Sequence, residues 1–114
     1  MELTDTHYRY LLTIYELSRT TLDVGAASVA RAMQVSKPSV TRMLKVLMDK
    51  GLLVKERYGK IYLTDRGVLL AKKFSDRVGR LKERIPQMEL ELTEEELGKL
   101  AGAMAAALPE DFTL

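Results

Sequence analysis

The sequence has 114 residues, of which 46% are hydrophobic and 30% are charged, so it predicts one folded domain with a modest core rather than a disordered chain. It contains no cysteine, which excludes disulfides, thiolate metal sites and cysteine nucleophiles. No apolar run approaches the roughly 18 residues needed to cross a bilayer, and no signal-peptide pattern opens the chain, so we expect a cytoplasmic protein without a membrane partner.

The net charge of +2 hides an uneven distribution along the chain. Residues 37–84 carry fourteen Lys and Arg against five Asp and Glu, a net charge of +9, whereas residues 85–114 carry one against seven, a net charge of −6. Clustered cations are typical of proteins that bind a polyanion, with a solvated charged face as the alternative. The basic charge of residues 37–84 therefore predicts that a polyanion would bind to the middle of the chain.

The first predicted helix begins after Thr4 or Asp5 and ends near Arg19. Its apolar side chains cover more than one narrow stripe, so we expect it to be buried on two sides. The stretch TTLDVG breaks this helix, and a short second helix is expected at about residues 26–33.

The stretch SKPSVTRMLKVLMDKGLL contains the third predicted helix. Ser36 is a natural N-cap, because its hydroxyl can accept a hydrogen bond from the amide of Ser39, and Pro38 stands in the first turn, where its missing N–H costs nothing. Gly51 ends the helix, since glycine adopts the left-handed conformation without strain. One face of this helix is apolar, and the opposite face combines short hydroxyls with long cations.

The hydrophobic period changes after the third helix. LLVKERYGKIYLT consists of two short extended runs around Tyr58–Gly59, which predicts a β-hairpin. Thr64 caps a fourth helix, which stops before Pro86, and QMELE is a connector.

A last helix begins with a capping box of Thr93 and Glu96 and ends near Leu108. We divide the chain accordingly into two parts. Residues 1–84 form a DNA-binding domain, and residues 85–114 form a connector and a C-terminal dimerisation helix.

Residues 26–50 fit a helix-turn-helix, two short helices joined by a tight turn. Ala30 supplies the small side chain that a close helix crossing needs. Gln34 stands where glycine is commonest, in a conformation that a polar side chain can adopt at modest cost. With a hairpin at residues 52–63, the predicted fold is mainly α with a small β-hairpin wing, a winged helix-turn-helix followed by C-terminal dimerisation helices.

The third helix and the hairpin carry the candidate DNA contacts. A helix fits the major groove with its N-terminal residues closest to the base edges, and a basic hairpin can follow the backbone or enter the minor groove. Arg42 is the best candidate for a bidentate contact to guanine, and Lys45 is better placed for a phosphate. The candidate DNA-binding residues are Ser36, Lys37, Pro38, Ser39, Thr41, Arg42, Lys45, Arg57, Tyr58, Lys60, Thr64 and Arg66.

Three stretches, YLLTIYEL, VARAMQVSKPSVTRMLKVLMDKGLL and LTDRGVLLAKK, resemble the N-terminal DNA-binding domain of the diphtheria toxin repressor and manganese transport regulator (DtxR/MntR) family. The resemblance covers roughly residues 5–80. The layout is also similar to that of the broader class of multiple-antibiotic-resistance (MarR) winged-helix regulators. Membership implies a homodimeric transcriptional regulator that binds a palindromic operator.

The resemblance also implies a Mn²⁺ or Fe²⁺ site, built from side chains on the first helix, a histidine on the helix after the wing and a later Glu-x-x-His pair. The matching positions here are Arg9 and Leu12 on the first helix and Val78 after the wing, which do not supply such ligands, and no histidine follows His7. We therefore expect no cofactor and no metal site of the family type. A weak adventitious site at His7 and Asp5 is the alternative to an ordinary first-turn histidine.

The last helix has an apolar stripe and carries no charge between residues 100 and 108, so another surface must cover it. We predict a homodimer built from the first and last helices, with packing inside one chain as the alternative. The expected dimer contacts are Tyr8, Leu11, Leu12, Leu97, Leu100, Ala101, Met104 and Leu108.

The sequence lacks a nucleophile–base pair and a glycine-rich phosphate loop, so we do not expect an enzyme. The main hypothesis is a sequence-specific homodimeric regulator, a repressor that binds double-stranded DNA and is open to an unknown small-molecule effector. One alternative is a winged-helix protein-interaction or assembly module without operator recognition. The other is a Mn- or Fe-dependent repressor with a non-standard site.

Overall fold

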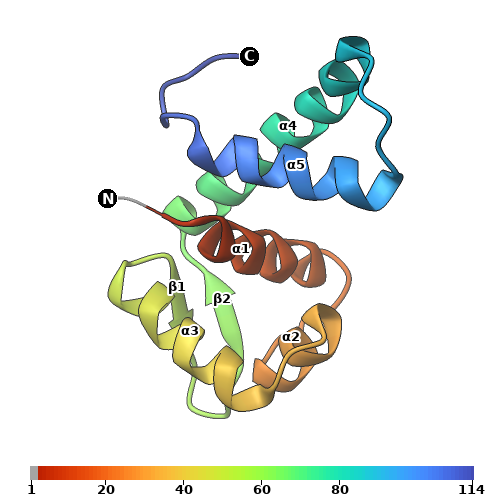
Figure 1. The fold of residues 1–114 in the computed structure, drawn as a ribbon. Helices are drawn as coiled ribbons and strands as arrows, with labels where there is room; N and C mark the ends of the chain where they lie inside the picture. Colours follow the sequence, from red (N-terminus) through yellow and green to blue (C-terminus); the bar gives the residue numbers. More distant parts are fainter. Residues whose placement is uncertain (1–2) are drawn as a thin grey trace.

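The computed structural model describes residues 3–114, which form helices and one two-stranded hairpin (Figure 1). These elements pack around two hydrophobic cores that share one long helix. The elements in chain order are α1 (Asp5–Ser18), α2 (Ala26–Met33), α3 (Lys37–Asp49), β1 (Leu53–Lys55), β2 (Ile61–Leu63), α4 (Asp65–Arg84), the 3₁₀ helix η1 (Ile85–Met88) and α5 (Glu94–Ala107). The two strands pair antiparallel, with Leu53 opposite Leu63. The predicted fold class, a mainly α winged helix-turn-helix with a small β-hairpin wing, is confirmed.

The helix starts are fixed by the hydroxyl caps that the sequence predicts. Each capping side chain accepts a hydrogen bond of 3.1–3.3 Å from the backbone amide three residues ahead, and the caps are Thr4, Ser36, Thr64 and Thr93. These bonds satisfy amides that the first turn of a helix leaves without a partner. Gln34, which ends α2, takes the left-handed conformation expected for the corner, with a φ angle of 56°.

The chain continues as η1 where the sequence predicts a plain connector. The end of the α-helix before Pro86 is confirmed, but Pro86 then enters the first turn of η1, because a proline needs no N–H there. Ile85 is only 1% exposed, so burial of its side chain stabilises this turn. Glu89 ends the turn with a φ angle of 62°.

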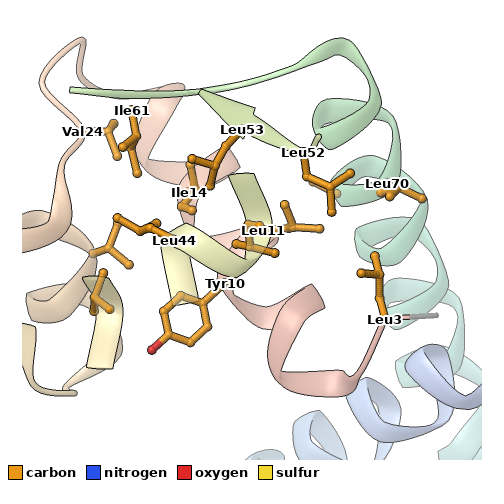
Figure 2. Close-up of a cluster of buried hydrophobic side chains, with 14 residues drawn as sticks. Leu3, Tyr10, Leu11, Ile14, Val24, Leu44, Leu52, Leu53, Ile61 and Leu70 are labelled. Atoms are coloured by element: carbon orange, nitrogen blue, oxygen red, sulfur yellow. The ribbon is translucent and has the colours of Figure 1, made fainter. Parts of the chain in front are cut away.

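The larger core lies between α1, α2, α3, the hairpin and the beginning of α4 (Figure 2). α1 contributes Leu11 and Ile14, both fully buried, to this core. On another side of the same helix, Tyr8 and Leu12 meet the smaller core, which confirms that the first helix is buried on two sides. Complete burial of one leucine or isoleucine side chain contributes about 1.5–3 kcal/mol relative to exposure.

The smaller core joins α5 to α4 and α1. The aromatic ring of Tyr8 stacks on that of Phe74, with the ring centroids 4.9 Å apart and 7° between the planes, and Ala101 of α5 is buried in the same core. α4 contributes to both cores, Leu70 to the larger and Phe74 to the smaller. α4 therefore connects the winged helix to the C-terminal helix.

The guanidinium group of Arg77 on α4 lies at the C-terminal end of α5. Its nitrogens are within hydrogen-bonding distance of five backbone carbonyl oxygens, those of Ala105, Leu108, Pro109, Glu110 and Phe112. The last carbonyls of a helix have no partner inside the helix and form the negative end of its dipole, so a cation is favourable there. Arg77 therefore fastens the end of α5 and the following segment to α4.

Gly67, in the first turn of α4, allows this helix to approach the hairpin closely. A Cβ atom at this position would lie 2.1 Å from the carbonyl oxygen of Leu52, which a backbone contact cannot tolerate. Gly79 lies further along the same helix, and within residues 3–114 nothing comes within 4 Å of its corresponding point. The two glycines lie in the same helix, Gly67 buried in its first turn and Gly79 exposed further along, so they form a pair for comparison.

We predict opposite effects for alanine at these two positions. Gly67→Ala should lower the free energy of unfolding by about 1–3 kcal/mol, because the start of α4 must move away from Leu52. Gly79→Ala should raise it by about 0.5–1 kcal/mol, because alanine favours a helix interior. Urea denaturation followed by circular dichroism measures both values, and equal shifts would contradict the close approach at Gly67.

Candidate nucleic-acid interface

The exposed face of α3 carries most of the residues that the sequence predicts as DNA contacts. Its other face is locked into the larger core by side chains that are at most 2% exposed, Val40, Leu44 and Leu47. The opposite face presents side chains that are all exposed, except that Ser39 is half-buried, and these are Ser36, Lys37, Pro38, Ser39, Thr41, Arg42 and Lys45. Core packing thus decides which side of α3 faces the solvent.

Hydroxyl groups restrain the side chains at the start of α3. The Ser36 hydroxyl lies 2.8 Å from that of Ser39, and Nη2 of Arg42 donates to the Ser39 hydroxyl over 3.3 Å. The Thr41 hydroxyl donates to the Lys37 carbonyl over 3.0 Å. A guanidinium group has five N–H donors, so Arg42 keeps others for a ligand while Ser39 restrains its direction.

The corner between α2 and α3 fixes the pose of α3. The Val35 amide donates to the carbonyl of Ala30 over 3.1 Å, across the left-handed Gln34. Ala30 packs against the larger core, as expected for the small residue at the helix crossing. The helix-turn-helix is therefore held by the backbone and by the core together.

The wing places an arginine and an aromatic side chain at its tip. Residues Glu56–Gly59 form the turn, closed by a 3.0 Å hydrogen bond from the Gly59 amide to the Glu56 carbonyl. Tyr58 is 90% exposed and Arg57 is also exposed. Both side chains are therefore free to contact a ligand.

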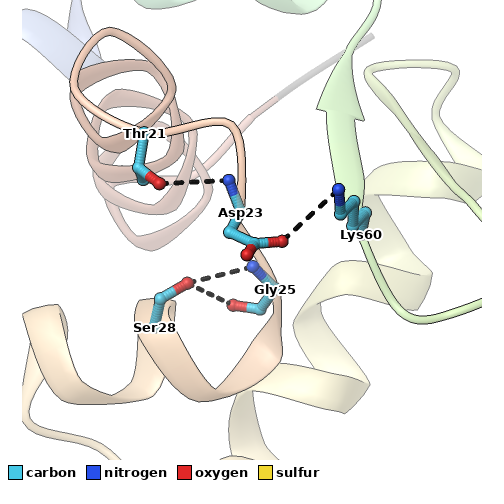
Figure 3. Close-up of polar contacts among 5 residues, drawn as sticks. All are labelled: Thr21, Asp23, Gly25, Ser28 and Lys60. Carbon is cyan, nitrogen blue, oxygen red and sulfur yellow. Dashed lines mark hydrogen bonds and ion pairs between the residues drawn. The ribbon is translucent and has the colours of Figure 1, made fainter.

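Lys60 lies between the turn of the wing and β2, where its charge is partly balanced (Figure 3). Its ammonium nitrogen forms an ion pair with Oδ1 of Asp23 over 3.4 Å. In the same region the Ile61 amide donates to the Val24 carbonyl over 2.9 Å, so the loop before α2 is joined to β2. Sequence analysis missed Asp23, because its partner lies 37 positions further along the chain and local spacing gives no signal for such a pair.

The start of α4 contributes one exposed cation. The Thr64 hydroxyl accepts from the Gly67 amide over 3.1 Å and donates to the Gly51 carbonyl over 2.8 Å, so it is engaged inside the fold. Arg66 is exposed at the same helix start. Arg66 is therefore accessible to a ligand, whereas the Thr64 hydroxyl is used to hold the start of α4.

The residues expected at a dimer interface are largely covered by their own chain. Leu11 and Ala101 are 0% exposed, which corrects their assignment as contacts, because the two cores of this chain already bury them. The other six are half-buried or engaged in the smaller core, and they are Tyr8, Leu12, Leu97, Leu100, Met104 and Leu108.

The glycines of α5 also face their own chain. An added Cβ at Gly102 would lie 3.6 Å from Oδ1 of Asp5, and one at Gly98 would lie 3.8 Å from Cε of Lys82. The exposed side chains of this helix include Ala103 and Ala107, which line an open groove of about 430 Å³ together with Leu3 and Ala106. The groove therefore leaves apolar surface beside α5 and the start of α1 open to solvent.

The positions that the family resemblance assigns to metal ligands meet in one cavity of about 350 Å³ between α1, α4 and α5. Arg9, Leu12 and Val78 line it. Within residues 3–114, His, Cys, Asp and Glu side chains nowhere gather in a group of three that could hold a metal ion. The donor set of this cavity therefore does not fit Mn²⁺ or Fe²⁺, which require several carboxylate or imidazole ligands.

His7 is occupied as a helix cap. Its Nδ1 accepts a 3.1 Å hydrogen bond from the Thr4 amide, which requires an unprotonated Nδ1. Burial, and then the positive charge of Lys50, lower the pKa of His7 from its usual value. The ordinary first-turn histidine is thus the arrangement that the structure contains.

Comparison with known proteins gives the family. The sequence matches the model of the iron-dependent repressor N-terminal DNA-binding domain over residues 2–61, more than half of the chain. The chain belongs to the iron-dependent repressor family. This is a family of DtxR/MntR-type, DNA-binding transcriptional regulators rather than enzymes, so the resemblance seen in the sequence is confirmed.

Solved structures of other regulators share the fold of this iron-dependent repressor family member. The manganese regulator SloR is 28% identical, with a TM-score of 0.75 over 96% of this chain and 50% of its own. The metal-dependent transcriptional regulator MtsR is 27% identical, with a TM-score of 0.73 over 90% of this chain and 47% of its own. ScaR, whose structure contains bound Zn²⁺, is 33% identical, with a TM-score of 0.68 over 91% and 48%.

The chain spans about half the length of these solved regulators. The shared half contains the winged helix-turn-helix, α4 and α5. Across residues 3–114, each helix is too short or too polar to cross a membrane.

Proposed function

We propose that this chain is a sequence-specific transcriptional repressor that binds a palindromic operator as a homodimer and acts in the cytoplasm. The observation that carries the proposal is the two-sided character of α3. One face is fixed in the core by Val40, Leu44 and Leu47, and the other exposes hydroxyls and cations. A helix held in this way presents a defined set of side chains to the major groove.

The proposed contacts divide into base readout and phosphate contacts. Arg42 reads a guanine, because its guanidinium can donate two parallel hydrogen bonds to O6 and N7. The short side chains of Ser36, Pro38, Ser39 and Thr41 let the helix approach the bases. The phosphate contacts are assigned to Lys37, Lys45, Arg57, Tyr58, Lys60 and Arg66.

The proposed division of the chain separates DNA binding from dimerisation. Residues 1–84 bind DNA, and residues 85–114 carry the dimerisation helix. The open groove lined by Leu3, Ala103 and Ala107 supports the assignment, since it leaves apolar surface on α1 and α5. The acidic net charge of residues 85–114 would keep this part away from the duplex.

A protein-interaction module is the competing function, and the composition of the exposed face of α3 disfavours it. Protein interfaces are enriched in aromatic residues and depleted of lysine and serine. The exposed face instead carries Lys37, Lys45 and Ser36. Such side chains suit phosphates and base edges better than an apolar partner.

We predict that the chain selects a palindromic sequence from a random duplex pool. Affinity for the selected duplex should exceed that for a scrambled duplex by about 10³-fold or more. Raising the salt from about 50 to 200 mM should weaken binding by about 10³-fold or more, if the dimer contacts six or more phosphates. Fluorescence anisotropy with labelled duplexes measures both effects. Equal affinity for the two duplexes would contradict operator recognition.

Arg42 and Lys45 provide a matched test of the assigned roles. Arg42→Ala should cost about 1–3 kcal/mol of binding free energy and relax specificity at one base pair of each half-site. Lys45→Ala should weaken binding to every duplex by a similar factor and reduce the salt dependence. Competition binding with a set of single-base operator variants separates the two. A uniform loss for Arg42→Ala would place that side chain on a phosphate.

Dimerisation should depend on the exposed face of α5. Ala103→Glu places a charge in the open groove without disturbing the cores, because Ala103 is exposed. We expect this variant to be monomeric at concentrations at which the unmodified chain is a dimer. Ala27→Glu, at an exposed position of α2, is the control and should keep the dimer. Analytical ultracentrifugation gives the masses, and a monomeric unmodified chain would contradict the proposal.

A further inference from the structure

The cavity between α1, α4 and α5 has walls that combine apolar, basic and acidic side chains. Leu12, Phe74 and Val78 supply apolar surface, and Gly98 supplies no side chain. Arg9 adds a positive charge. A divalent cation entering this space would lose hydration at apolar walls and would be repelled by a guanidinium group.

Three carboxylates line the cavity, those of Asp5, Glu94 and Glu95, but within residues 3–114 they do not come together as a group that could hold a metal ion. Glu95 forms an ion pair with Lys99 over 3.4 Å, so a second cation accompanies this carboxylate. Oδ1 of Asp5 is buried against Gly102 without a hydrogen-bond partner, at the start of α1, where the helix dipole favours a negative charge. Glu94 and Glu95 are exposed on the first turn of α5, so these two side chains and one buried oxygen fall short of the six or so ligands of a hard divalent ion.

Contacts within the protein hold the same three helices together. The stacked rings of Tyr8 and Phe74 join α1 to α4. Arg77 joins α4 to the end of α5 through the carbonyls of residues 105–112, and Lys73 adds a 3.3 Å hydrogen bond to the Glu110 carbonyl. Arg80 reaches the carbonyl of Leu114 over 3.0 Å. These contacts connect the three helices to one another, as a metal ion with ligands on all three would.

We infer that the cavity between α1, α4 and α5 takes no divalent cation, and that protein contacts stand in place of one, with Arg77 holding α5 on α4 and the ring stack holding α1 on α4, so that duplex binding by this chain is independent of Mn²⁺ and Fe²⁺. The inference concerns regulation of the proposed DNA-binding site and rests on that proposed function. It separates this chain from the manganese regulator and the metal-dependent regulator that it resembles in fold.

The first experiment compares the chain after dialysis against EDTA with the same chain in Mn²⁺ or, without oxygen, in Fe²⁺. We expect the melting temperature to stay unchanged and the duplex affinities to agree within twofold. Inductively coupled plasma mass spectrometry should find less than a tenth of an equivalent of bound metal. A melting temperature or an affinity that rises with metal would overturn the inference. Absence of duplex binding in all conditions would instead defeat the proposed function, while the melting and metal measurements would still decide the inference.

A positive control tests whether the side chains are the cause. The triple substitution Arg9→Asp, Leu12→Glu and Val78→His supplies two carboxylates and an imidazole to the cavity. We expect Mn²⁺ to raise the melting temperature of this variant by several degrees, because a ligand that binds only the folded state stabilises it. A triple variant that ignores Mn²⁺ would overturn the assignment of metal independence to these three positions.

Substitution of Arg77 tests whether this side chain holds α5 in place. Arg77→Met keeps the aliphatic stem and removes the donors to the carbonyls that follow Ala105. We expect faster hydrogen exchange in residues 94–112, with unchanged exchange in α3. Lys72→Met is the control, since Lys72 is exposed on α4 and makes no hydrogen bond or ion pair with residues 3–114. Equal exchange in the two variants would overturn the role of Arg77.

Discussion

Burial of one face of α3 in the larger core is the constraint on which the rest of the structure depends. Val40, Leu44 and Leu47 anchor this face, and their burial leaves no freedom for α3 to roll about its axis. The exposed cations and hydroxyls are thereby aimed in one direction. Specific reading of a groove requires this, because hydrogen bonds to base edges depend on direction as well as charge.

α4 extends the same constraint toward the C-terminus. Its first turn packs on the backbone at Leu52, and its later turns hold Phe74 and Arg77 against α5. A displacement of α5 would therefore be transmitted to the wing through one continuous helix. Two copies joined through α5 would hold their α3 helices at a fixed separation, which is what half-sites about 34–36 Å apart demand.

Local features of this fold could be predicted from sequence, and long-range pairings could not. The caps at Thr4, Ser36, Thr64 and Thr93 are visible because donor and acceptor lie three residues apart. The helix-turn-helix can be recognised in the sequence because its apolar core positions and its turn all lie within residues 26–50. The exposed face of α3 follows from the same periodicity, although whether its residues contact DNA is still a prediction.

The apolar stripe of α5 shows the limit of such reasoning. Hydrophobic spacing says that Ala101 and its neighbours must be covered, but not whether the cover comes from another chain or from α4. Arg77 is 28–35 positions from the carbonyls that it contacts, so the spacing of residues along the chain does not reveal these hydrogen bonds. A side chain that donates hydrogen bonds to carbonyl oxygens far along the chain produces no recognisable pattern in the sequence.

The joint between the wing and the loop before α2 has a consequence for the shape of the bound duplex. The Val24–Ile61 hydrogen bond and the close approach of Gly25 to Gly59 leave the hairpin little room to hinge against α3. A duplex that spans both must supply the adjustment itself by bending or by changing its groove width. Flexible pyrimidine–purine steps outside the contacted bases would make that deformation less costly, so operator choice would extend to base pairs that no side chain touches.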